Sequence, residues 1–139
     1  MMITRVFLLL SIVAIAVGKL QSNQATDNQK LIWVQRGGNI DGLAEGDQAK
    51  NPSLGADGLT VAVAGKAHDG INGEESGVNR VWKVVNVVWV QQGGNIDGLA
   101  EGDKAMSPSL SADGLTIAVN GRKHDGPNGE DSGVTRVLK

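Results

Sequence analysis

The stretch "PSLGADGLTVAVAG" at residues 52–65 sets the fold, because it has the pattern of a β-hairpin. Its turn is Asp57-Gly58, where the glycine supplies the positive φ that tight hairpin turns require. In the arm after the turn, residues 59–64, larger apolar residues on one face alternate with threonine or alanine on the other. This period of two predicts a β-strand.

The same hairpin recurs 56 residues later as "PSLSADGLTIAVNG", with its turn at Asp113-Gly114. Both copies belong to a longer repeat, which aligns residues 33–83 with residues 89–139 without a gap. Roughly three quarters of the aligned positions are identical. An internal repeat of this kind is typical of solenoids, propellers and arrays.

Short β-branched and aromatic runs predict the remaining strands at Leu31–Gln35, Val78–Lys83, Val87–Gln92 and Val134–Leu138. In chain order the strands then fall into groups of one, four and three. We therefore predict an all-β fold of two four-stranded antiparallel propeller-type blades. The N-terminal strand Leu31–Gln35 is expected to complete the last blade by pairing with the sheet formed by residues 109–138.

The N-terminus has the pattern of a secretory signal peptide at residues 1–18. Arg5 precedes twelve apolar or small residues at 6–17, which are too few for a membrane anchor because a spanning helix needs about 20. Residues 19–30 are polar and unpatterned, and they predict a flexible leader before a two-repeat domain at residues 31–139. The sequence therefore predicts a secreted, extracellular protein with no membrane span in the mature chain.

Composition limits both the stability and the partners of the domain. The net charge of −2 is spread over interspersed acids and bases, and it gives no basic patch for nucleic acid. There is no cysteine, no tyrosine and one phenylalanine, so disulfides cannot support a core of small side chains. We expect a homo-oligomer, because assembly of roughly two to four copies would reach the four to eight blades of a propeller.

Three motifs resemble a known family. They are W-x-Q-x-G-x-x-I-x-G-x-A-x-G-D from residue 33, S-L-S-x-D-G-x-T-x-A from residue 109, and S-G-V-x-R-V from residue 76. Together they resemble the FG-GAP-like, integrin-alpha-type β-propeller repeat. The resemblance implies a four-stranded blade per repeat and an adhesive or ligand-binding surface. The Phe-Gly and Gly-Ala-Pro elements are missing, and the Asp-rich calcium loop is replaced by the turns "GADG" and "SADG".

The acidic stretch "GGNIDGLAEGD" occurs at residues 37–47 and again at 93–103. Calcium takes six to eight oxygen ligands, and carboxylates separated by glycines can wrap such an ion. The candidate calcium ligands are Asp41, Glu45, Asp47, Asp97, Glu101 and Asp103. The alternative is an inter-blade crossover in which Asp side chains bond nearby amides.

A second loop, "HDGINGE" at residues 68–74 and "HDGPNGE" at 124–130, gathers His, Asp, Asn and Glu. These residues suit a transition metal, a sugar bound against a tryptophan, or a solvated turn-rich loop. Ser76 and Ser132 follow, but no nucleophile motif surrounds them, and we expect no catalytic residues and no enzyme.

Four further side chains carry structural expectations. Trp33 and Trp89 occupy equal positions in the two repeats and are expected to pack on the sheets. Arg80 and Arg136, also equivalent, are expected to form structural ion pairs with loop acids.

These patterns predict a secreted, non-enzymatic binding or adhesion module built from β-propeller repeats, with an extracellular protein or glycan as ligand. One alternative is a two-blade carbohydrate-binding lectin whose copies assemble into a closed propeller. Another is an inactive fragment of a longer propeller protein.

Overall fold

The computed structural model describes residues 31–139. The chain divides into a unit that ends at Val34 and a second unit, Gln35–Lys139, which holds every described strand. The predicted signal peptide at residues 1–18 and leader at residues 19–30 lie outside the described residues. Within the described part, no helix has the length and apolar character needed to cross a membrane.

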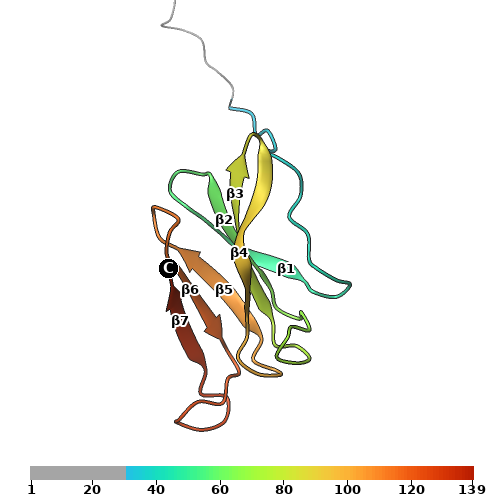
Figure 1. Ribbon diagram of the computed structural model, residues 1–139, viewed down its shortest axis with the longest axis vertical. Coiled ribbons are helices and arrows are strands. Elements are labelled where there is room, and N and C mark those ends of the chain that lie inside the picture. The colour runs from blue at the N-terminus through green and yellow to red at the C-terminus, as the bar shows by residue number, and fades with distance from the viewer. Residues whose placement is uncertain (1–30) are drawn as a thin grey trace, which may run out of the picture. The chain divides into compact units, whose positions relative to one another are not determined.

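The first sheet is antiparallel and has four strands in the order β1-β2-β3-β4, of which β4 comes from the start of the second repeat (Figure 1). Its strands are β1 (Ala49–Leu54), β2 (Thr60–Gly65), β3 (Val78–Val85) and β4 (Val88–Asp97). This arrangement confirms the all-β class and the predicted group of four strands. β4 is longer than expected, because the first half of the second acidic stretch continues the strand to Asp97 instead of forming a loop.

The rest of the second repeat forms a three-stranded antiparallel sheet, β5-β6-β7 (Figure 1). Its strands are β5 (Ala105–Leu110), β6 (Ile117–Gly121) and β7 (Val134–Leu138). The two sheets share a register: Ser53 pairs with Ala62 in the first, and Ser109 with Ala118 in the second. The hairpin turns also match, since Gly58 and Gly114 have φ of 64° and 68°. The predicted role of these two glycines is therefore confirmed.

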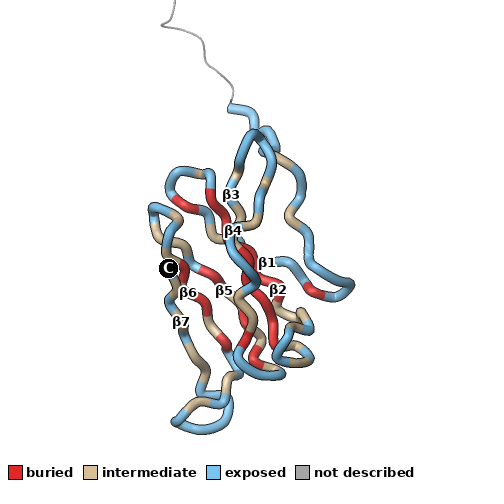
Figure 2. Tube along the Cα trace, viewed as in Figure 1, coloured by how far each residue is buried: buried red, intermediate tan, exposed pale blue. Residues whose placement is uncertain are grey.

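The core lies where the two sheets meet. Ala62, Ile117 and Val119 form its buried cluster, and β2 is buried along its whole length (Figure 2). The other buried apolar side chains are equally small: Val61, Val63, Ala64, Val78 and Ala105. Small side chains suit this interface because β5 packs closely against β1 and β2.

Two loops fasten the sheets to each other. The crossover loop, residues 98–104, joins β4 to β5 and lies against the repeat-1 loop, residues 66–77. Three backbone hydrogen bonds connect them: Gly98 N to Gly77 O (3.0 Å), Gly102 N to Glu74 O (2.9 Å) and Lys104 N to Glu75 O (3.0 Å). A fourth joins Ala105 N, at the start of β5, to Ser76 O (2.8 Å). The sheets are thus joined by main-chain contacts at one end as well as by the core.

The expected pairing of Leu31–Gln35 with the second sheet is wrong for this structure. These residues form no strand, and among the described residues the second sheet has only three strands. Leu31–Val34 are largely exposed, and the Trp33 side chain is fully exposed, which corrects its predicted packing on a sheet. An isolated strand gains no ladder hydrogen bonds, so β-forming composition alone does not make this segment a strand. The described residues therefore form two sheets and no closed propeller.

Candidate functional site

Two buried carboxylates organise the acidic stretches. Asp47 Oδ2 accepts the backbone N–H groups of Leu43 (2.6 Å) and Ala44 (2.9 Å), and it lies 3.1 Å from Nδ1 of His68. The second repeat has the same arrangement, in which Asp103 Oδ2 accepts from Leu99 (2.7 Å) and Ala100 (3.0 Å) and lies 3.1 Å from His124 Nδ1. Each aspartate thus closes its own loop and ties it to the "HDG" loop of the same repeat.

The environment of Asp47 favours its ionised form. Burial by itself would raise the pKa of this carboxyl group, but the Ala44 N–H, His68 and the Leu43 N–H outweigh burial. The net result is a pKa of Asp47 below its ordinary value. A carboxylate held in this way at neutral pH acts as a fixed acceptor for the loop, and the facing Nδ1 of His68 must carry the proton.

Asp41 and Asp97 contribute main-chain oxygens to a different contact. The guanidinium of Arg80 donates to the carbonyl of Asp41, and that of Arg136 donates to the carbonyl of Asp97. The predicted ion pairs of these arginines with loop acids are therefore wrong, because their hydrogen bonds go to backbone oxygens. Arg80 is nearly fully buried, and burial lowers its pKa, although Asp47 opposes the change.

The six candidate calcium ligands are not gathered at one point. Asp47 and Asp103 are committed to backbone amides, while Glu45 and Glu101 are exposed at the loop surfaces. Over residues 31–139, no three His, Asp or Glu side chains are placed to hold a metal ion together. The contacts seen here are those of the crossover-turn interpretation, and calcium binding stays a prediction.

Calcium binding has a direct test. An ion that binds only the folded chain raises the melting temperature by mass action. If these loops bind calcium, added calcium should raise the melting temperature, and Asp41→Ala combined with Asp97→Ala should abolish the rise. An unchanged melting temperature of the parent protein, measured by scanning calorimetry with and without calcium, would leave the stretches as turns only.

Ser76 and Ser132 each stabilise their own loop by accepting a backbone hydrogen bond. Ser76 Oγ accepts the N–H of Gly70 (3.1 Å), and Ser132 Oγ accepts that of Gly126 (2.9 Å). Ser76 is also completely buried. These hydroxyl groups close the turns of the "HDG" loops, and the contacts show no His facing either oxygen.

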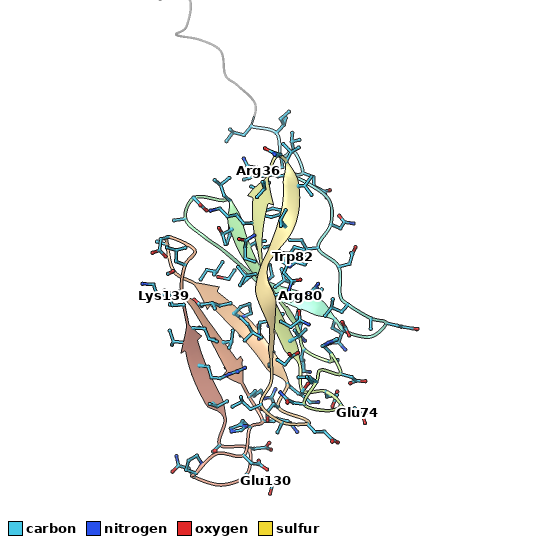
Figure 3. The ribbon with its side chains drawn as sticks, in the orientation of Figure 1. Arg36, Glu74, Arg80, Trp82, Glu130 and Lys139 are labelled. Atoms are coloured by element: carbon cyan, nitrogen blue, oxygen red, sulfur yellow. The ribbon has the colours of Figure 1, made fainter. Side chains whose placement is uncertain are left out.

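A charged hollow of about 250 Å³ lies between the loops of the two repeats. It is lined by Glu75, Glu101, Gly102, Lys104, Lys123, Asp125, Glu130 and Asp131. Across it, Lys104 forms an ion pair with Glu75 (2.8 Å), and this contact lowers the pKa of Glu75. Figure 3 shows Glu74 and Glu130 at the same end of the two sheets, away from Arg36. Five carboxylates and two lysines line the hollow, so acidic side chains outnumber basic ones on this loop face.

A larger groove of about 430 Å³ separates β4 from the end of β7. Its apolar part includes Ile96, Leu110, Leu115 and Leu138, and its polar part includes Gln92, Asn95 and Asp113. Sequence patterns predicted neither this groove nor the charged hollow. Both are formed by residues distant in sequence, and only the packing of the two sheets brings them together.

The chain matches no protein-family model, no curated protein and no solved structure. The resemblance to the FG-GAP-like repeat therefore stays a prediction from the motifs.

Proposed function

We propose that this chain is a secreted, non-enzymatic binding module built from β-propeller-type blades. Its binding surface would be the loop face that carries the charged hollow. The observation that supports this surface most directly is the hollow itself, which both repeats line with equivalent loops. Loops on a rigid sheet scaffold are the usual place for recognition.

The charge of the hollow indicates the class of ligand. Glu101, Glu130 and Asp131 line it and form no ion pair among the residues the structure describes. Lys104 is already paired with Glu75, which leaves Lys123 as the second cation in the lining. A surface with excess carboxylates favours a ligand with exposed lysine or arginine side chains. The proposed ligand is therefore a basic segment of an extracellular protein.

Binding can be measured with a lysine- and arginine-rich peptide. Glu101→Gln combined with Glu130→Gln should weaken binding roughly 2- to 30-fold, since exposed ion pairs contribute about 0.2–1 kcal/mol each. Added salt should reduce the affinity further, because exposed charges are screened. Isothermal titration calorimetry at two salt concentrations measures both effects.

A matched control is Asp57→Asn combined with Asp113→Asn, which removes two negative charges at exposed hairpin turns while keeping acceptors for the Leu59 and Leu115 N–H groups. This variant should bind like the parent protein. Equal weakening by the control would mean that net charge alone attracts the peptide, and the loop face would lose its support. Binding to a glycan array in place of the peptide would favour the two-blade lectin alternative.

A further inference from the structure

β7 has a free edge. Among the described residues, the second sheet ends at β7, which pairs only with β6. In the first sheet, the equivalent strand β3 has β4 on that side, joined to it by seven residue pairs. The second sheet thus lacks the outer strand that the first sheet has.

The sequence of the missing strand is present in the chain. Residues 32–41 are the repeat counterpart of β4, and they differ from it only at Ile32 and Arg36. In the structure they belong to no strand. Within residues 31–139 there are therefore a strand-forming segment without a partner and a sheet edge without a strand, and exposed edges of this kind attract other chains.

The repeat indicates which β7 the segment would meet. Arg80 holds the carbonyl of Asp41 in the same way that Arg136 holds the carbonyl of Asp97. Asp97 is the last residue of β4 in the first sheet, whereas Arg136, which contacts its carbonyl, lies on β7 in the second sheet. A segment held in this way therefore belongs to the sheet before that of its arginine. Arg80 lies on β3 in the first sheet, so residues 32–41 belong by the same reasoning to a sheet that comes before the first sheet. The chain's own second sheet comes after the first, so the preceding sheet is that of another copy.

We propose that copies of this chain assemble head to tail, with residues 32–41 of one copy adding to the free edge of β7 in a second copy. The inference does not depend on the ligand of the loop face. A contact of this heterologous kind closes into a ring if the rotation allows it and otherwise continues as a filament.

The loops supply a second, independent observation. The repeat counterpart of the crossover loop is the entry loop, residues 42–48, and that of the repeat-1 loop is the repeat-2 loop, residues 122–133. The four backbone hydrogen bonds that join the crossover loop and Ala105 to the repeat-1 loop have no equivalent between the entry loop or Ala49 and the repeat-2 loop in residues 31–139. Both loops are largely exposed, so each half of a known junction lacks its counterpart among the described residues.

Gly133 fits the same arrangement. Its counterpart Gly77 has φ of 76° and approaches Ala105 so closely that an added Cβ would lie 2.7 Å from the Ala105 oxygen. Gly133 has a similar φ of 74°, but the nearest atom to an added Cβ is 3.3 Å away, on Arg122. In the assembly, Ala49 of the second copy would occupy the place that Ala105 takes beside Gly77.

The 430 Å³ groove places apolar surface beside the end of β7, where the added strand would lie. It lies between β4 and the end of β7, where Leu138 and Lys139 line it. In the first sheet, β4 pairs along the equivalent end of β3. A strand added to β7 would run beside Leu138 and Lys139 and so border this groove, and burial of apolar surface there favours association.

The register of β3 and β4 gives the test, because it predicts Arg36 opposite Val137 and Gln35 opposite Leu138 between copies. The chain has no cysteine of its own. We would prepare Arg36→Cys and Val137→Cys as separate full-length variants, mix them and oxidise the mixture. The pair Gln35→Cys and Leu138→Cys is treated alike, since both kinds of antiparallel pair lie within disulfide range.

A disulfide-linked heterodimer is expected for both register pairs. A mixture of Arg36→Cys with Ile71→Cys, which places the second thiol on an exposed side chain of the repeat-1 loop outside the proposed contact, should give no such product. Association through the apolar N-terminal residues would not select the register pairs over this control. Addition of Gly133→Ala to the Val137→Cys chain should reduce the cross-link, because a methyl group would then face Ala49 of the second copy.

Two outcomes would overturn the proposal. One is the absence of cross-linking in both register mixtures when circular dichroism shows that every variant is folded. The other comes from a single chain carrying both Arg36→Cys and Val137→Cys: a monomer with an internal disulfide would mean that the segment pairs within its own chain.

Discussion

Gly77→Ala should destabilise the protein far more than the same change at its repeat counterpart Gly133. At Gly77 the φ of 76° costs an alanine about 1–2 kcal/mol. The added Cβ would also overlap the backbone of Ala105, to which Gly77 is bridged at the junction of the two sheets. Overpacking adds roughly 1–3 kcal/mol, so we expect a total loss of about 2–5 kcal/mol in the free energy of unfolding.

Gly133→Ala is the matched control, because it has the same strain without the close contact. We expect a loss of only about 1–2 kcal/mol from its left-handed backbone. Both variants should be compared by urea denaturation of dilute protein, since association between copies would add a concentration-dependent term. Equal losses at the two glycines would mean that backbone strain alone matters and that the Gly77–Ala105 contact is not tight.

Much of the sheet structure was predictable because its signals are local. The Asp-Gly turns and the alternation after them define two hairpins, and the repeat then assigns the same role to equivalent residues. Arg80 and Asp47 show the limit of prediction from local signals. The first bonds a carbonyl 39 residues away, and the second a histidine 21 residues away, and neither partner follows from composition. One signal was available for the second contact: the Asp-to-His spacing of 21 residues recurs between Asp103 and His124.

Leu31–Gln35 illustrates a different limit. Its β-branched and aromatic residues have the composition of a strand, and the second repeat turns the same pattern into β4. A strand, however, is stabilised by its neighbour, and the neighbour of this segment is not determined by its own residues. The two tryptophans show the consequence, since Trp89 is half-buried and donates to the Arg36 carbonyl (2.8 Å) while Trp33 is fully exposed.

Asp103→Ala should be the most damaging change in the acidic stretches. It removes a buried acceptor from two backbone N–H groups and from His124, and the loss should be about 2–4 kcal/mol because hydrogen bonds to charged groups contribute more than neutral ones. Asp47→Ala removes the same contacts in the entry loop. Its effect should be smaller, about 1–3 kcal/mol, because the entry loop makes no junction between the two sheets. Urea denaturation of both variants measures the difference.

Acid titration separates the charge of Asp47 from its packing. Because the folded-state pKa of Asp47 is lowered, its ionised form stabilises the fold fully above the ordinary pKa of an aspartate. That contribution disappears as the pH falls from the ordinary value through the lowered one. Asp47→Asn keeps an acceptor for Leu43 and Ala44 but cannot titrate. Its free energy of unfolding should therefore be lower than that of the parent at neutral pH and should converge with the parent's as the pH falls below both pKa values. Parallel curves for the two proteins across this range would show that the Asp47 carboxylate does not stabilise the fold through its charge.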